Sequence, residues 1–224
     1  MSVLAALRAF LIGTPRIVVT VGSQSNYDLN ADLQASYGWN GVDSIIVHCY
    51  VTGALSGTTP FDTGADATGG SIDLTLFNQS TIKGAGGNGG NANSGSGAAG
   101  SDAINIQYNI KYDNSAGEIS GGGNGGNAGA LIPGGPGDPK DPPDPPDTGG
   151  GGGGGAGTPA GSGGYGNPPG SPGSATAGGA GGVSPGNSGS PGSGLGTSGK
   201  AINLNGNTAT DVGASAGTIN GAIS

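Results

Sequence analysis

The sequence has few of the residues that proteins use for covalent cross-links, metal clusters and charged interfaces. Cys49 is the only cysteine and His48 the only histidine, which excludes an intramolecular disulfide and a cysteine-based metal cluster. Charged residues make up 9% of the chain, and six Lys and Arg face fourteen Asp and Glu, for a net charge of −8. Because phosphate neutralisation requires clustered basic residues, we expect no nucleic-acid partner.

Long hydrophobic runs are also missing. The N-terminal stretch MSVLAALRAFLIGTP is too short to span a bilayer. Arg8 lies inside its apolar part rather than before it, unlike the charge pattern of a signal peptide. The sequence therefore predicts no membrane insertion and no export signal, with synthesis in the cytoplasm.

The same stretch predicts a short amphipathic helix over residues 2–12, ended by Gly13 and Pro15. Its apolar stripe can pack against the core or dock onto a partner protein. The residues of the stripe, which are the partner-docking candidates, are Leu4, Leu7, Phe10 and Leu11.

Three later segments predict β-strands. RIVVTVGS at 16–23 and DSIIVHCYVTG at 43–53 are rich in β-branched residues, and SIDLTLFNQSTIKG at 71–84 has apolar residues in period two. We therefore expect a mostly β N-terminal region over 1–82, with very little α-helix.

Glycine dominates the remainder, 83–224. The whole chain contains 55 glycines and 15 prolines among 224 residues, and this share is typical of disorder unless a repeat is present. Disorder usually combines low hydrophobicity with high charge, and the charge is missing here. Side-chain-free segments favour polyproline II geometry, so 83–224 is expected to be a polyglycine II-type helix bundle with exposed loops and short strand-like repeats.

A repeat supports an ordered bundle. The segments 71–84, 103–121 and 201–221 each begin with Ile, an acid or amide residue, and Ile or Leu, and each ends with Ile, one residue and Gly. Such self-similarity is typical of stacked units that cover one another's apolar faces. The Asn residues of the two GGNGGN motifs, at 86–91 and 122–127, could then face outward or cap the helices.

No motif in the chain predicts catalysis or a cofactor. GAGGNG at 84–89 matches a dinucleotide pattern, but no amphipathic helix follows it. GGNGGN lacks the carboxylate of a calcium repeat. His48 and Cys49 are adjacent on an expected strand and so point to opposite faces. We therefore expect no enzyme, no cofactor and no metal site.

Asp and Pro alternate in GDPKDPPDPPDTGG. Its Asp residues recur every third position, which places them on one edge of a polyproline II helix about 9 Å apart. That spacing is too wide for one shared calcium ion, so we expect a stiff solvated loop.

Isolated tyrosines are the candidates for contact with a receptor. Tyr108 and Tyr112 lie within the second repeat, and Tyr165 stands alone in GGYGNPPG. Aromatic side chains in loops with few other side chains are plausible anchors for a protein or sugar. The alternative is that they pack against the chain's own repeats.

Residues 38–130 resemble a known group of proteins. SYGWNGVDSIIVHCYVTGALSG, LFNQSTIKGAGGNGGNA, AINIQYN and NSAGEISGGGNGGNAG are similar to a glycine-rich block of bacteriophage tail-fibre and tail-tip proteins. The glycine runs also resemble those of the distal tail-fibre adhesins of T-even-type phages. In these, an N-terminal attachment domain caps the fibre, and loops of a polyglycine II sandwich bind outer-membrane proteins or glycans.

The resemblance implies a non-enzymatic, receptor-binding virion protein of the phage tail, made in the host cytoplasm. Its N-terminal region would attach to another tail protein, its loops would meet a bacterial surface protein or glycan, and it is a possible homo-oligomer. One alternative is a structural virion element that uses the glycine bundle as a rigid spacer. Another is a bacterial glycine-rich surface protein or an ice-binding protein.

Overall fold

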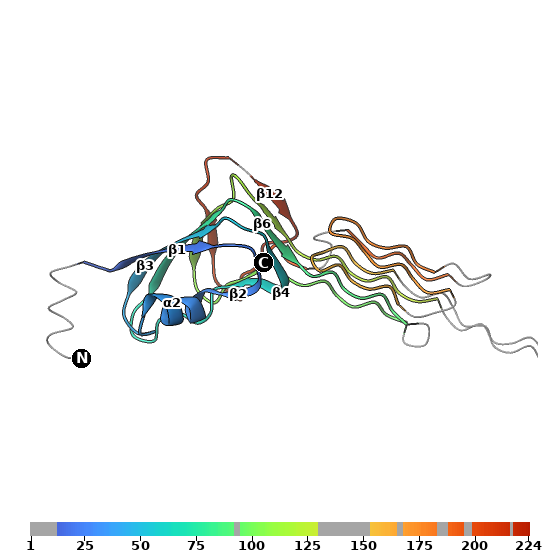
Figure 1. The fold of residues 1–224 in the computed structure, drawn as a ribbon, viewed down its shortest axis with the longest axis horizontal. Helices are drawn as coiled ribbons and strands as arrows, with labels where there is room; N and C mark the ends of the chain where they lie inside the picture. Colours follow the sequence, from blue (N-terminus) through green and yellow to red (C-terminus); the bar gives the residue numbers. More distant parts are fainter. Residues whose placement is uncertain are drawn as a thin grey trace, which may run out of the picture.

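The chain forms a stack of parallel β-strands from which a bundle of extended glycine-rich runs projects (Figure 1). The computed structural model describes residues 13–91, 95–129, 153–164, 168–182, 188–194, 199–215 and 217–224. Within these ranges no helix is long and apolar enough to cross a membrane. The mostly β prediction with very little helix is confirmed, since α2 (Leu29–Tyr37) is the helix that the described residues contain.

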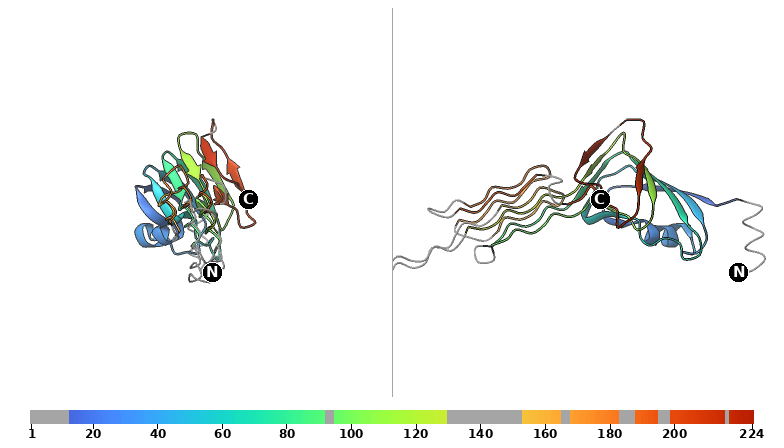
Figure 2. Two further views of the ribbon diagram at one scale, coloured as in Figure 1. Left: turned by 90° about the vertical axis from the view of Figure 1, so that its right-hand side faces the viewer. Right: turned by 180° about the vertical axis from the view of Figure 1, so that it is seen from behind.

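Two parallel sheets form the stack (Figure 2), and the strands of the five-stranded sheet lie side by side in chain order. The five-stranded sheet contains β1 (Arg16–Val21), β3 (Ile45–Val51), β5 (Ile72–Asn78), β8 (Ile110–Asp113) and β11 (Ala209–Asp211), in that order. The chain thus winds around the stack and returns to the same sheet once in every turn. We call each turn a coil, and each coil lies on the one before it.

The seven-stranded sheet supplies the other sides of each coil. It contains β2 (Gln24–Asp28), β4 (Leu55–Asp62), β6 (Thr81–Gly84), β7 (Ile104–Asn105), β9 (Glu118–Ser120), β10 (Ile202–Asn203) and β12 (Thr218–Asn220). The first half of β4 pairs with β6, whereas its last residues, Phe61 and Asp62, pair with β7. The sheet therefore divides at β4 into two sides.

Apolar residues stack in columns inside the coils. In β3, alternate residues from Ile45 to Val51 are buried, as expected for strands with one face on a core. Strand pairing then places Leu74 between Val47 and Ile110 in one column of the five-stranded sheet. All of these residues belong to a single buried cluster, so each coil covers the apolar surface of its neighbour.

Helix α2 packs against the first coils. Asp28 is its N-cap, with Oδ1 accepting a hydrogen bond from the Ala31 N–H at 2.9 Å, and Gly38 ends it in the left-handed conformation. Leu29 and Leu33 are fully buried in the core cluster. The sequence reasoning missed this helix, although the Asp and Gly caps could have signalled it.

The predicted strands are confirmed in part. Segments 16–23 and 43–53 contain β1 and β3, but 71–84 is divided between β5 and β6, which belong to different sheets. The expected division at residue 82 also differs from the structure, because strands beyond that point pair with strands before it. The predicted helix over 2–12 lies outside the described residues.

Over most of its length, the sequence repeat corresponds to a repeat in the structure. Its closing isoleucines, Ile82, Ile119 and Ile219, are paired in register across β6, β9 and β12. The opening Ile104 and Ile202 are also paired. The opening of the first repeat does not belong to this column, because Ile72 pairs with Ile45 in the other sheet.

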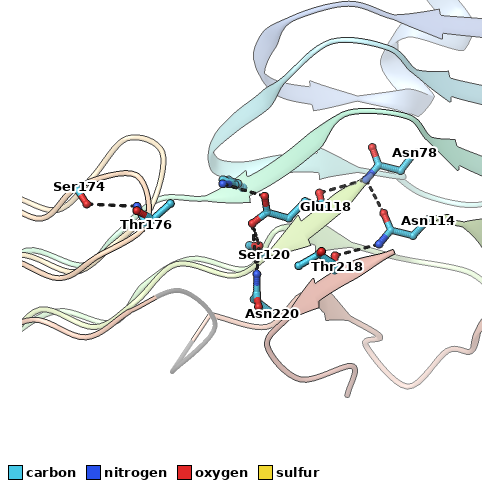
Figure 3. Close-up of polar contacts among 9 residues, drawn as sticks. Asn78, Asn114, Glu118, Ser120, Ser174, Thr176, Thr218 and Asn220 are labelled. Carbon is cyan, nitrogen blue, oxygen red and sulfur yellow. Dashed lines mark hydrogen bonds and ion pairs between the residues drawn. The ribbon is translucent and has the colours of Figure 1, made fainter. Parts of the chain in front are cut away.

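Polar side chains connect the coils where β5 and β8 end (Figure 3). Asn78 and Asn114 are each 2% exposed, and Asn78 Nδ2 donates to Asn114 Oδ1 at 2.7 Å. Asn78 Nδ2 also donates to the Glu118 carbonyl at 3.2 Å, and Asn114 Nδ2 donates to the Thr218 carbonyl at 3.0 Å. The two amides therefore join three successive coils.

A second polar network lies on β6, β9 and β12. Lys83 Nζ is 3.1 Å from Glu118 Oε2, and Ser120 Oγ donates to Glu118 Oε1 at 2.7 Å. Asn220 Nδ2 donates to Ser120 Oγ at 2.9 Å. Burial by itself raises the pKa of Glu118, but the hydrogen bond from Ser120 and the contact with Lys83 outweigh it and lower the pKa overall.

The glycine-rich runs leave the stack between β6 and β7 and between β9 and β10 (Figure 1). We name them in chain order. They are run a (85–91), run b (95–101), run c (121–129), run d (153–158), run e (159–164), run f (168–174), run g (177–182) and run h (188–194).

Run d lies at the centre of the bundle. The N–H groups of Gly153, Gly154 and Gly155 donate to carbonyls of runs h, f and a, at 3.0, 2.9 and 2.7 Å. The carbonyls of the same three residues accept hydrogen bonds from runs c, g and e. The donor pattern recurs after three residues, since Ala156 again donates to run h and Gly157 to run f.

Side chains are excluded from this centre. A Cβ at Gly153 would lie 2.0 Å from the Gly179 carbonyl oxygen of run g, and one at Gly154 would lie 1.9 Å from that of Gly161 in run e. A Cβ at Gly155 would lie 2.0 Å from the Gly123 oxygen of run c. Only glycine permits backbones to approach this closely from every side.

We predict that Gly155→Ala destabilises the bundle, because the backbone of run c would have to move to admit a methyl group. Overpacking of this kind costs about 1–3 kcal/mol, which should appear as a lower midpoint in chemical denaturation. Gly194→Ala is the matched control, since a Cβ at Gly194 meets nothing within 4 Å. Equal stability of the two variants would contradict the close packing of run d.

We also predict that Asn114→Ala destabilises the coil stack, because it leaves Asn78 Nδ2 with one acceptor fewer and the Thr218 carbonyl without its side-chain donor. Loss of a buried hydrogen-bond partner costs about 1–3 kcal/mol. Thermal unfolding should show a lower Tm than for Gln79→Ala, which alters an exposed neighbour of the same corner. An unchanged Tm would show that the amide pair contributes little.

Candidate functional site

The ends of the glycine runs that point away from the sheets form the candidate site. Run-to-run hydrogen bonds place Gly164 beside Gly170, and Gly182 beside Gly189, at this end. Figure 1 shows the runs reaching away from the stack toward it. The described residues that stand at the far ends are Asn91, Gly95, Gly129, Gly153, Gly164, Pro168, Gly182 and Ser188.

Four connecting segments begin and end at these positions. They are 92–94, 130–152, 165–167 and 183–187, and all of them lie outside the described residues. Their attachment points are nevertheless fixed by the runs, so segments far apart in the sequence start from one end of the molecule. The Asp-Pro segment belongs to 130–152 and therefore also lies outside the described residues.

Asn and Ser side chains fasten neighbouring runs together. Asn88 Oδ1 of run a accepts from the Ser162 N–H of run e at 2.9 Å, and Asn127 Oδ1 of run c accepts from the Gly97 N–H of run b at 3.0 Å. The Ser190 hydroxyl of run h accepts from the Asn127 N–H at 2.7 Å. Asn88 and Asn127 thus connect runs, a role that differs from the cap and the free surface position considered from sequence.

The glycine runs are uncharged. None of the runs a to h contains a charged residue. A shallow groove of about 420 Å³ lies between runs b, c and h, and its polar lining consists of Asn124, Asn127, Ser190 and Ser193. Contacts made by this part of the molecule would therefore rely on neutral hydrogen bonds and on shape.

Two of the predicted contact tyrosines are in the core. Tyr108 and Tyr112 are each 5% exposed and belong to the buried cluster, which agrees with the packing alternative. Burial raises the pKa of both. Neither can serve as an exposed anchor, because the apolar columns of the coil stack enclose them. The prediction of receptor contact was wrong for these two residues.

The remaining predicted site residues lie outside the described residues. Tyr165 follows Gly164 and precedes Pro168 by three positions, so it belongs to a segment attached at the far ends of runs e and f. The partner-docking candidates of the N-terminal stretch, which precede the described chain at Gly13, are Leu4, Leu7, Phe10 and Leu11.

His48 and Cys49 occupy opposite faces of β3. Cys49 is fully buried, and burial raises the pKa of its thiol to about 12. His48 lies on the outer face, where its ring is 5.7 Å from that of Phe77. Phe77 also stacks on Tyr50 at 4.7 Å. Among the described residues, no three His, Cys, Asp or Glu side chains are grouped so that they could hold a metal ion.

Comparison with solved structures gives a similar fold. The chain resembles a protein in the crystal structure of the gp37-gp38 adhesin tip complex of the bacteriophage S16 long tail fiber. The TM-score is 0.56 and the sequence identity 23%, and the match covers 96% of this chain and 86% of the other. At this identity the likeness concerns the fold. No match was found among curated proteins.

A family model identifies the sequence itself. The model that describes phage tail fibre adhesin Gp38 matches residues 16–224. The match therefore includes the coil stack, the glycine runs and the segments that connect their far ends. The chain belongs to the Gp38 family of phage tail fibre adhesins.

Proposed function

We propose that this adhesin binds the bacterial surface with the segments at the far ends of its glycine runs, and that it does so without catalysis. The observation that carries the proposal is the convergence of four connecting segments on one end of the molecule. Loops held by a rigid scaffold are where binding residues concentrate. A bacterial surface protein or glycan is the proposed partner.

The opposite end is proposed to join the virion tail. The described chain begins at Gly13, on the side of the stack away from the glycine runs (Figure 1). The similar S16 structure is that of a complex with gp37, which supports a second fibre protein as partner. Docking by the apolar stripe with Leu4 and Leu7 remains part of this proposal, as does synthesis in the host cytoplasm.

The runs are proposed to be polyglycine II helices packed side by side. The three-residue recurrence of hydrogen bonds from run d and its enclosure by other runs support this geometry. Such a bundle needs no apolar core of its own, because each buried peptide group finds a partner in a neighbouring run. Its rigidity would hold the far-end segments at a constant distance from the tail.

Affinity is proposed to arise from several weak contacts. Linked sites raise the effective concentration of later binding events, so many segments on one adhesin, or many adhesins on one particle, need no single strong site. A homo-oligomer would add to the same effect. The alternative function is a rigid spacer that makes no contact with the host, and it requires the same bundle.

We predict that purified protein competes with the parent phage for adsorption to host cells. Adsorption rate should fall as protein is added, because occupied receptors are lost to the phage. Tyr165→Ala should weaken the inhibition about tenfold if this side chain is an anchor, since such truncations cost roughly 1–2 kcal/mol. Tyr37→Ala is the control, because Tyr37 is 42% exposed but lies on α2. Adsorption unaffected by the wild-type protein would favour the spacer.

Amide hydrogen exchange of the full chain tests the bundle. The N–H groups of Gly153, Gly154 and Gly155 should exchange slowly, because each donates to another run and lies at the centre. The N–H of Gly22 provides an exposed reference in the same molecule. If the central amides exchange at the rate of an unfolded peptide, the glycine-rich runs are flexible linkers and do not form a bundle.

A further inference from the structure

A shallow groove of about 660 Å³ runs along α2, far from the ends of the glycine runs. One wall is the helix and the other is the segment after β4. Its lining includes three exposed alanines, Ala31, Ala35 and Ala65, and two exposed carboxylates, Asp28 and Asp66. A groove lined by both methyl groups and carboxylates matches a side chain that is apolar along its length and cationic at its end.

Hydrogen bonds connect the two walls and hold the two carboxylates. Asn30 Nδ2 on the helix donates to the Ala65 carbonyl on the opposite wall at 2.5 Å. Asp28 Oδ1 accepts from the Ala31 N–H at 2.9 Å, and Asp66 Oδ1 accepts from the Ala67 and Ile72 N–H groups at 2.8 and 3.0 Å. Each carboxylate is thereby held in place by backbone donors, which are neutral.

Within the part of the chain that the structure describes, no Lys or Arg forms an ion pair with Asp28 or Asp66. Residues 17–82 contain no Lys or Arg, and their acidic residues are Asp28, Asp32, Asp43, Asp62, Asp66 and Asp73. The ion pairs found among the described residues join Lys83 to Glu118 and Lys111 to Asp73. None of the described basic side chains meets the charges of Asp28 and Asp66, which can therefore pair with an external cation.

We propose that this groove docks a Lys- or Arg-bearing segment of the fibre protein that carries the adhesin. The methylene groups of such a side chain would cover Ala31 and Ala35, and its charge would lie between Asp28 and Asp66. The inference rests on the proposed attachment to a tail protein. Charge complementarity identifies the occupant, and the groove's place on the side of the molecule remote from the far ends separates it from host contact.

The test measures binding of full-length adhesin to purified virions of the parent phage that lack it. Asp28→Asn and Asp66→Asn each remove one negative charge from the groove lining and keep the oxygen that accepts the backbone hydrogen bonds, and Asn is as good an N-cap as Asp. Each should weaken binding about two- to fivefold at low salt, as expected for one exposed charge pair. The difference should shrink as salt screens the pair.

Two further variants separate a docking role from a general charge effect. Asp73→Asn makes the same change in net charge on the outer face of the five-stranded sheet, where Asp73 pairs with Lys111, and should leave binding unchanged. Ala35→Lys places a cation on the exposed groove wall in a residue that favours helix, and should weaken binding more than either Asn variant. Circular dichroism and Tm confirm that each variant is folded.

The outcomes distinguish this inference from the proposed function. If the wild-type protein binds and all four variants bind with the same affinity and salt dependence, docking in this groove is refuted. The proposed attachment to the fibre would then still hold. Equal weakening by Asp28→Asn, Asp66→Asn and Asp73→Asn would also overturn it, since net charge alone would then explain binding. Absence of wild-type binding to the particles would instead overturn the proposed attachment to the tail.

Discussion

The bundle depends on direct hydrogen bonding between backbones that have no side chains between them. At Gly153, Gly154 and Gly155 of run d, each peptide group is hydrogen-bonded to other runs, and an added Cβ would lie about 2 Å from a carbonyl oxygen. Glycine normally weakens structure, because it loses the most conformational entropy on folding. Here its lack of a side chain provides the stabilising contacts, because every buried N–H and C=O of the central run can be paired.

The coil stack fixes the position from which each run starts. Glycines have no side chains with which to choose a neighbour or a register, and within the runs only a few Asn and Ser side chains make such contacts. The stacked isoleucines Ile82, Ile119 and Ile219 fix the points where runs a and c leave the sheets and where the chain ends. Asn78 and Asn114 connect the same coils where β5 and β8 end. The spacing between the coils therefore sets the spacing between the runs that leave them.

Charge is separated along the molecule. Runs a to h contain no charged residue, while residues 17–82, which include α2, contain six Asp and no Lys or Arg. The uncharged runs bring no charge of their own to a contact, and an acidic face remote from their far ends can select a basic partner. This division of chemistry agrees with an adhesin whose two ends have different partners.

The sequence by itself determined the strands β1 and β3, the repeat with its closing isoleucines, and the family resemblance, because period-two patterns and repeated motifs are local signals. It also indicated that the glycine segments are ordered. It left open which way Tyr108 and Tyr112 face, and it placed a boundary at residue 82 where the sheets continue. Only the tertiary structure decided these points, because parallel pairing joins strands separated by long glycine insertions, and the enclosure of a side chain depends on the coils above and below it.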